Sequence, residues 1–195
     1  MIGYVGRLTV EKSVRFLADL ERELIRSGVA DFRFLIVGQG SEEGWLRANL
    51  RSAEFTGVLT GEALGRAYAN MDVFAFPSRT DTYGNVVLEA FASGVPAVVT
   101  DSGGPRFIIH HGENGFVTSD LREFASCVEG LIRNPPQLAA MRRSARSHAL
   151  SASWDAVFDS VYAGYGYGLR SGSVAGRNVR MRHVVGACPD AAGLI

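Results

Sequence analysis

Two acidic side chains, Asp81 and Glu89, lie on either side of Gly84 in the stretch RTDTYGNVVLEAFASGVP, residues 79–96. A strand pattern ends just before this stretch and a helix pattern starts at Gly84, so the acids belong to a loop and the helix after it. Free backbone N–H groups at a helix start favour an anion, and carboxylates accept strong hydrogen bonds from sugar hydroxyls. The spacing therefore fits a ligand with phosphate and hydroxyl groups. It fits equally well a turn residue, Asp81, and a solvated helix residue, Glu89.

Two basic side chains, Arg7 and Lys12, follow the first apolar run, which ends at Gly6. An arginine and a lysine at a strand-to-helix junction can hold a diphosphate between them. Lysines also occur at helix starts for structural reasons, so the position alone leaves both interpretations open.

The stretch LIVGQGSEEGWL, which starts at Leu35, is close to a dinucleotide-binding glycine motif but lacks two of its parts. Glu43 replaces the third glycine, and no acidic residue ends the following strand at the expected offset. We therefore exclude nicotinamide and flavin cofactors, and we expect Gly38 and Gly40 to allow close approach of the backbone to a ligand. No cluster of His, Cys, Asp or Glu has the spacing of a metal site, so the sequence predicts neither a metal ion nor another cofactor.

Each group of candidate residues follows a short apolar run, so the groups occupy equivalent places in the expected fold, each at the end of a strand. Six such runs alternate with amphipathic segments that begin near residues 10, 42, 61, 84, 120 and 135. The runs are IGYVG, FRFLIVG, FTGVL, DVFAFPS, PAVVTD and GFVTS. Apolar strands separated by helices predict an α/β fold, a Rossmann-like doubly wound parallel sheet of about six strands. Ligands bind such sheets at the carboxyl ends of the strands, where the loops gather.

The composition limits which kinds of partner and how many domains the chain can have. The chain has 195 residues, of which 47% are hydrophobic, and a formal net charge of +0. This composition suits one globular domain, and the neutral charge argues against nucleic-acid binding. No apolar run reaches the roughly 18 residues of a membrane span, although peripheral membrane contact stays open, and two distant cysteines indicate reduced thiols in a cytoplasmic protein. We expect a domain at residues 1–167 and a disordered tail at 168–195, where Gly, Ser and Arg prevail.

Taken together, the motifs resemble those of a known family. The matching pieces are GYVGRLTVEKS, FLIVGQGSEEGWL, FTGVLTGEALGRAYANMDVFAFPS, TDTYGNVVLEAFASGVPAVVTDSGGP and HHGENGFV. The chain is similar to the C-terminal, donor-binding half of a family 4 glycosyltransferase with the GT-B fold. The combination of motifs is far more specific than any one of them. The resemblance implies a retaining glycosyltransferase without a metal, a UDP- or GDP-sugar donor, and an N-terminal GT-B domain that this chain lacks.

The resemblance also implies roles for single residues. Glu89 matches the second acid of the family's E-x7-E motif, which holds the nucleotide ribose, and Asp81 replaces the first glutamate, which contacts the donor sugar. Arg7 and Lys12 match the pair that binds the donor diphosphate, so we assign catalytic roles to Arg7, Lys12 and Asp81. We assign substrate binding to Val58 and Leu59 at the base, to Thr82, Tyr83, Gly84 and Asn85 at the sugar and phosphate, and to Gly6, Gly38, Gly40, Val86 and Glu89. Phe107 stands where the family usually has an acid, and nothing in the sequence explains that change.

Two other functions remain compatible with the sequence: a non-catalytic nucleotide-sugar-binding module, and an epimerase with the GT-B fold. The fold alone does not decide among them. In the family mechanism the departing diphosphate gathers negative charge, which Arg7, Lys12 and the helix start at Gly84 can stabilise. The paired acids favour transfer, and the pyridoxal lysine of GT-B phosphorylases has no counterpart here.

Overall fold

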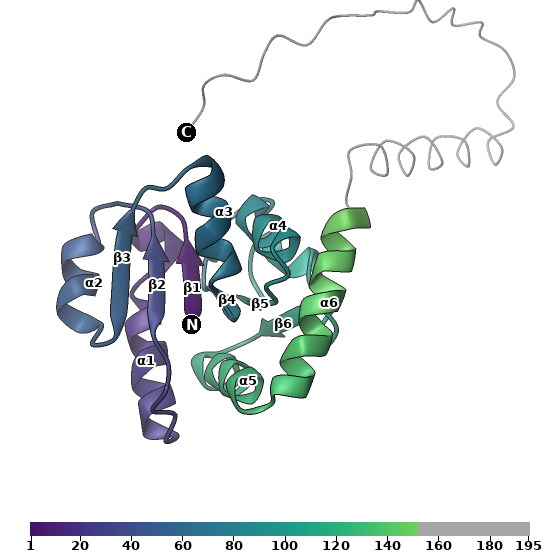
Figure 1. The fold of residues 1–195 in the computed structure, drawn as a ribbon. Coiled ribbons are helices and arrows are strands. Elements are labelled where there is room, and N and C mark those ends of the chain that lie inside the picture. Colours follow the sequence, from purple (N-terminus) through teal and green to yellow (C-terminus); the bar gives the residue numbers. More distant parts are fainter. Residues whose placement is uncertain (152–195) are drawn as a thin grey trace, which may run out of the picture. The chain divides into compact units, whose positions relative to one another are not determined.

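The apolar runs of the sequence form one parallel sheet in the computed structural model, which describes residues 1–151. Its strands lie in the order β3-β2-β1-β4-β5-β6, each parallel to its neighbours (Figure 1). They are β1 (Ile2–Val5), β2 (Phe34–Val37), β3 (Ala53–Gly57), β4 (Val73–Phe76), β5 (Ala97–Thr100) and β6 (Gly115–Thr118). The prediction of a Rossmann-like α/β sheet of about six strands is confirmed. The predicted domain end at residue 167 and the predicted tail at 168–195 lie outside the described residues.

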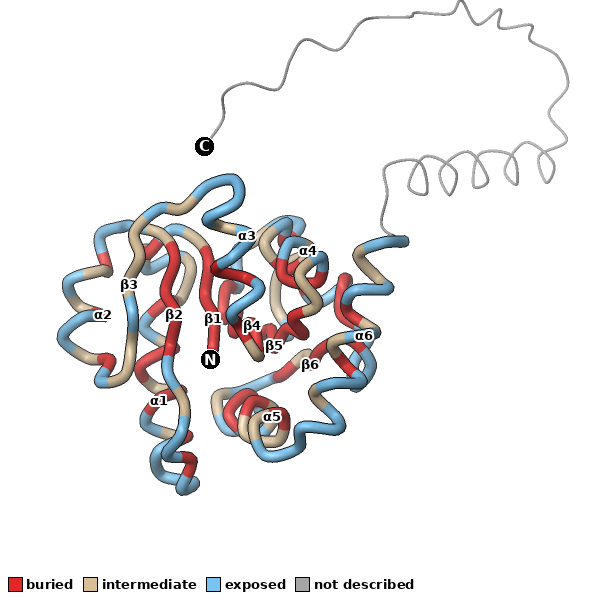
Figure 2. Tube along the Cα trace, viewed as in Figure 1, coloured by how far each residue is buried: buried red, intermediate tan, exposed pale blue. Residues whose placement is uncertain are grey.

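The central strands of the sheet form its buried core, which Figure 2 shows in red. Every residue of β1, β2, β4 and β5 is buried, because helices cover both faces of the sheet. The edge strand β3 is only partly buried. It begins at Ala53, before the predicted run FTGVL, because the exposed Glu54 breaks the apolar pattern while the backbone still pairs with β2. Val58 and Leu59 consequently lie in the loop after the strand.

Within residues 1–151, six α-helices and two short 3-10 helices accompany the strands. They are α1 (Phe16–Arg26), α2 (Glu43–Asn49), α3 (Gly61–Ala69), α4 (Asn85–Ala92), α5 (Leu121–Arg133), α6 (Pro135–Ser151), η1 (Val10–Lys12) and η2 (Pro105–Phe107). The helix predicted near residue 10 is divided into η1 and α1, because Ser13 between them has a left-handed φ of 54°. Helices α1 and α5 contact each other on one face of the sheet, and α3 and α4 contact each other on the other face (Figure 1).

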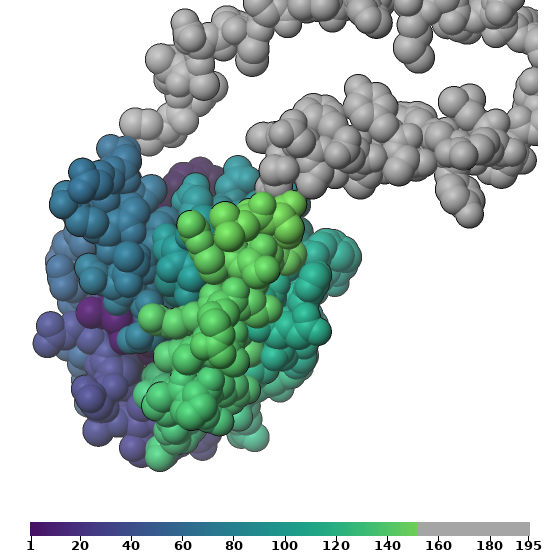
Figure 3. Space-filling view, turned by 45° about the vertical axis from the view of Figure 1, so that its right-hand side comes forward, coloured from purple at the N-terminus to yellow at the C-terminus, as the bar shows by residue number. Residues whose placement is uncertain are grey.

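Helix α6 packs against both α4 and α5 and buries Met141 and Ala145. Figure 3 shows it in light green, running along the surface of the molecule. Among the helices of residues 1–151, none combines the length and the apolar character that crossing a membrane requires.

The strand order places β1 next to β4, although the two strands are far apart in the sequence. From β1 the chain continues to β2 on one side, and from β4 it continues to β5 on the other side. The loops after β1 and β4 therefore start side by side and then turn apart, which opens a crevice between them. This switch point carries Arg7 and Lys12 on one loop and Asp81 on the other.

Candidate functional site

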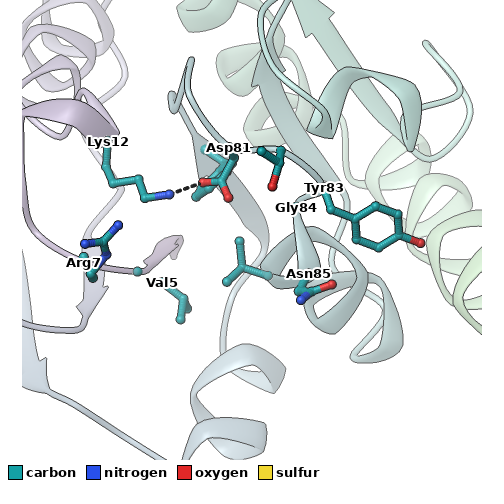
Figure 4. Close-up of a pocket in the computed structure, with 11 residues that line it drawn as sticks. Val5, Arg7, Lys12, Asp81, Tyr83, Gly84 and Asn85 are labelled. Carbon is teal, nitrogen blue, oxygen red and sulfur yellow. Dashed lines mark hydrogen bonds and ion pairs between the residues drawn. The ribbon is translucent and has the colours of Figure 1, made fainter. Parts of the chain in front are cut away.

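A cavity of about 240 Å³ lies between the loops that follow β1 and β4 (Figure 4). Its lining residues are Val5, Gly6, Arg7, Lys12, Phe76, Asp81, Thr82, Tyr83, Gly84, Asn85 and Val86. Nine of these were singled out from the sequence, and the structure adds Val5 and Phe76, which are apolar side chains at the ends of β1 and β4. The residues thus come together as the parallel-sheet rule predicts, while their individual roles remain predictions.

Lys12 and Asp81 point toward each other at the cavity and form an ion pair (Figure 4). Lys12 Nζ donates to Asp81 Oδ2 at 2.6 Å, and the two side chains are only 16% and 23% exposed. Lys12 is the only lysine of the 195-residue sequence. Arg7 pairs with Glu11 at 2.7 Å, but these side chains are 70% and 51% exposed. Lys12 is therefore held inside the cavity, whereas the Arg7 guanidinium is free to reorient.

The N-terminus of α4 forms another wall of the cavity. Gly84 precedes the helix with a left-handed φ of 91°, which residues with a side chain rarely adopt. Gly84 offers no side chain to cap the helix, and although the Val87 N–H donates to the Gly84 carbonyl oxygen at 2.9 Å, the N–H groups of Asn85 and Val86 keep their capacity to bind a ligand. Together with the positive end of the helix dipole they favour an anion here. The Tyr83 side chain points away from Lys12 and Arg7 (Figure 4).

The loop that carries Asp81 is held in place from two sides. The Gly104 N–H, in the turn after β5, donates to the Asp81 carbonyl oxygen at 2.7 Å. A Cβ atom on Gly104 would lie 1.9 Å from the Thr82 carbonyl oxygen, so only glycine permits this approach of two backbones. On the other side, the Thr80 hydroxyl donates to the Glu11 carbonyl oxygen at 3.1 Å. These contacts keep the Asp81 carboxylate inside the cavity.

Tyr4 supports the loop after β1, a role that the sequence did not reveal. The residue is fully buried, and its hydroxyl donates to the Arg7 carbonyl oxygen at 3.0 Å. Burial, and then the negative charge of Asp81, raise the pKa of this hydroxyl, so it remains a donor. In the sequence, an aromatic residue within an apolar strand carries no signal that separates it from ordinary core residues.

Glu89 lies outside the cavity lining, four residues after Asn85 on the same face of α4. The residue is exposed, and its Oε2 atom accepts a hydrogen bond of 2.8 Å from the hydroxyl of Tyr68 in α3. Tyr68 is only 2% exposed and, like Tyr4, was not expected at the site. Burial, and then the neighbouring charge of Glu89, raise the pKa of the Tyr68 hydroxyl.

Besides Glu89, four predicted substrate-binding residues lie outside the cavity lining: Gly38, Gly40, Val58 and Leu59. A Cβ atom on Gly38 would lie 2.0 Å from the Gly6 carbonyl oxygen, and one on Gly40 would lie 2.2 Å from the Leu8 carbonyl oxygen. The close approach at these glycines is therefore made to the chain's own backbone after β1, which they help to shape. Their contact with a ligand remains a prediction, as does base contact at the other two positions.

The described residues also bear on metal binding. Among residues 1–151, no group of three or more His, Cys, Asp or Glu side chains is arranged to hold a metal ion. The positive charge at the cavity comes from Lys12, Arg7 and the N-terminus of α4.

One protein-family model, described as Glycosyl transferases group 1, matches residues 1–134. The chain belongs to this family. One relative is the GDP-mannose-dependent alpha-mannosyltransferase of Mycolicibacterium smegmatis, which is 36% identical over 169 residues. The matched segment covers 85% of this chain and 42% of that protein. The D-inositol 3-phosphate glycosyltransferase of Rhodococcus erythropolis is 30% identical over 179 residues, 85% of this chain and 40% of that protein. The chain thus spans less than half the length of these two relatives.

Solved structures with this fold include the pneumococcal O-GlcNAc transferase GtfA in complex with UDP and GlcNAc. Its TM-score is 0.70 at 20% sequence identity, over 87% of this chain and 36% of that one. This degree of identity shows the fold alone. The prediction of a glycosyltransferase of the GT-B fold type is confirmed for this group 1 chain by the family match and by the fold.

Proposed function

We propose that this chain supplies the donor-binding part of a retaining glycosyltransferase, which transfers a sugar from a UDP- or GDP-sugar to an acceptor. The observation that carries the proposal is the cavity between β1 and β4, because it gathers Lys12, Arg7 and the N-terminus of α4 around one space. Two cations and a helix start suit a diphosphate, whose charge they can share. Two known proteins support this donor class: the mannosyltransferase relative is GDP-mannose-dependent, and the pneumococcal structure holds UDP and GlcNAc.

The same groups can assist the chemical step. When the bond between the sugar C1 atom and the diphosphate oxygen breaks, its electron pair stays on the diphosphate, so negative charge grows there. Lys12, Arg7 and the α4 N–H groups then bind more strongly than in the ground state, which lowers the barrier. As Lys12 turns to the phosphate, the Asp81 carboxylate becomes free to accept a hydrogen bond from a sugar hydroxyl.

The retaining outcome follows if the departing phosphate oxygen accepts the proton of the acceptor hydroxyl. The acceptor then attacks C1 from the face that the diphosphate leaves, so the anomeric configuration is kept. This step needs the acceptor beside the cavity, and the residues that hold the acceptor belong to the rest of the protein in this proposal.

A nucleotide-sugar-binding module without catalysis is the second candidate. The observation in its favour is that the groups gathered at the cavity, Lys12, Arg7 and the N-terminus of α4, all suit the binding of a diphosphate, which by itself requires no transfer. Turnover separates the candidates, because the module binds the donor without consuming it.

The binding part of the proposal is tested by calorimetric titration of the chain with GDP, UDP and the matching nucleosides. Lys12→Ala is expected to weaken diphosphate binding about tenfold or more, since a charge-assisted hydrogen bond contributes roughly 1.5–3 kcal/mol, and to leave nucleoside binding unchanged. Added salt should reduce the difference. Arg122→Ala, which removes an exposed charge on α5, is the matched control and should bind like the wild type. Equal losses for nucleosides and diphosphates would overturn the diphosphate assignment.

The catalytic part is tested with the full-length protein. Donor consumption is followed by release of the nucleoside diphosphate, and the anomeric configuration of the product is read by proton NMR. The proposal expects the donor's configuration in the product. An inverted product overturns the retaining mechanism, and donor binding without any consumption across an acceptor panel favours the module.

A further inference from the structure

Tyr68 occupies an unusual position for a tyrosine of the core. Its ring is packed beside Phe74 of β4, with the ring centroids 5.9 Å apart, and the residue is 2% exposed. Its hydroxyl nevertheless reaches the surface carboxylate of Glu89 at 2.8 Å. A buried, rigid group on α3 therefore holds an exposed, flexible side chain on α4.

The hydrogen bond has a fixed direction. Burial, the Glu89 charge and the hydrogen bond itself all raise the pKa of the Tyr68 hydroxyl, so the hydroxyl remains protonated and always donates. Within residues 1–151 the Glu89 carboxylate has no other hydrogen-bond partner, so Oε1 keeps its full capacity to accept. A glutamate on a helix surface otherwise samples several rotamers, which it must give up when it binds a ligand.

The face of α4 that carries Glu89 leads to the cavity. Asn85 lines the cavity, and Glu89 follows one turn later on the same face. A ligand whose diphosphate lies at the helix start can therefore extend along α4 to the Glu89 carboxylate.

We propose that Tyr68 is a positioning residue, which fixes the Glu89 carboxylate in advance for the ribose hydroxyls of the donor nucleoside. The inference rests on the proposed function, since it takes the ligand to be a nucleoside diphosphate. Tyr68 itself does not touch the ligand, and its effect passes entirely through Glu89.

The test is a double-mutant cycle with two ligands. Tyr68→Phe removes only the hydroxyl, and Glu89→Gln removes the charged acceptor. Affinities for a nucleoside diphosphate and for its 2′,3′-dideoxy analogue are measured by calorimetry. We expect Glu89→Gln to weaken nucleoside diphosphate binding about tenfold or more and Tyr68→Phe to weaken it about threefold to tenfold. We expect the double mutant to match Glu89→Gln, and the dideoxy analogue to bind wild type and Tyr68→Phe alike.

Thr118→Val is the matched control, because it also removes a hydroxyl from a residue that is 2% exposed, one that donates to the Val99 carbonyl oxygen in the sheet. It should lower the melting temperature without changing either affinity. A loss on Tyr68→Phe that persists undiminished in the Glu89→Gln background, or that is equal for both ligands, would show that the hydroxyl only supports the fold.

The cycle also separates this inference from the proposed function. If the wild type binds nucleoside diphosphates through Lys12 but Glu89→Gln or Tyr68→Phe changes nothing, the positioning role is wrong and the diphosphate site stands. If the wild type binds no nucleoside diphosphate, both are wrong.

Discussion

Removing the charge of Asp81 is expected to strengthen diphosphate binding while it impairs sugar transfer. Lys12 Nζ pairs with Asp81 Oδ2 at 2.6 Å, so a diphosphate must draw the ammonium away from the carboxylate. Asp81→Asn keeps the size of the side chain and removes its charge. The ammonium is then released for phosphate, whereas the sugar loses its charged acceptor.

The magnitude follows from the burial of the pair. Unit charges about 4 Å apart attract by about 1 kcal/mol in water and about 4 kcal/mol at an effective dielectric constant of about 20. With side chains 16% and 23% exposed, the pair lies between these limits, and desolvation offsets much of the attraction. A charge-assisted hydrogen bond contributes roughly 1.5–3 kcal/mol and a neutral one roughly 0.5–1.5 kcal/mol. The difference of about 1–1.5 kcal/mol corresponds to diphosphate binding about fivefold to tenfold tighter in Asp81→Asn.

The single lysine of the sequence makes the assay selective. Labelling the lysine side chain with ¹⁵N gives one Nζ signal, that of Lys12, which should shift in Asp81→Asn and again when diphosphate is added. Calorimetry with the same ligand supplies the affinity. Glu62→Gln removes one negative charge from an exposed ion pair on α3 and is the matched control for the change in net charge.

The reasoning is refuted if Asp81→Asn binds diphosphate as weakly as the wild type or more weakly while the Lys12 signal shifts. That result would mean that the ion pair helps to build the site rather than competing with the ligand. A tightening of the same size in Glu62→Gln would instead reveal a general effect of net charge.

Three further predictions concern stability. Gly104→Ala should unfold at a lower temperature and lose diphosphate affinity, because its Cβ atom would collide with the loop before α4, whereas Gly130→Ala in the open part of α5 should gain about 0.5–1 kcal/mol; the melting temperature and a diphosphate titration check both. Asp120→Ala should cost about 1 kcal/mol in the free energy of unfolding, measured by urea titration, since its side chain caps α5. The Nδ1 atom of His148 lies 3.2 Å from the Asn114 amide nitrogen, and burial lowers the pKa of this imidazole. As the pH falls, the unfolded chain is therefore protonated at His148 before the folded protein is. The stability contributed by neutral His148 should therefore be present above about pH 6.5 and be lost as the pH falls below it, and His148→Gln should flatten a plot of melting temperature against pH.

The sequence predicted the residues of the cavity because their placement depends on local patterns. Apolar runs mark the ends of β1 and β4, and parallel strands bring those ends to one edge of the sheet. Arg7, Lys12, Asp81 and Gly84 each follow such a run within a few residues, so their meeting requires no knowledge of side-chain packing.

What the sequence left out depends on contacts between distant segments. Tyr4 and Tyr68 look like core aromatics, and only the packed structure shows where their hydroxyls end. Gly38 and Gly40 indicate that another group comes close to the backbone at these positions. Whether that group is a ligand or the chain itself depends on the path of the loop after β1. The start of β3 was misplaced because an edge strand is held by backbone pairing, which the exposed Glu54 does not disturb.

The junction of β1 and β4 is the narrowest in the sheet, with two paired positions, Ile2 with Val73 and Gly3 with Phe74, where every other junction has three or four. This junction also joins the half of the sheet that consists of β1, β2 and β3 to the half that consists of β4, β5 and β6. The cavity lies across the same junction. A ligand held by both loops acts as a reversible cross-link between the halves, because it binds only when they are docked and adds its binding free energy to their docking. Hydrogen exchange at the amides of β1 and β4 should slow as ligand concentration rises. The availability of donor would then set how often the two halves of this sheet come apart.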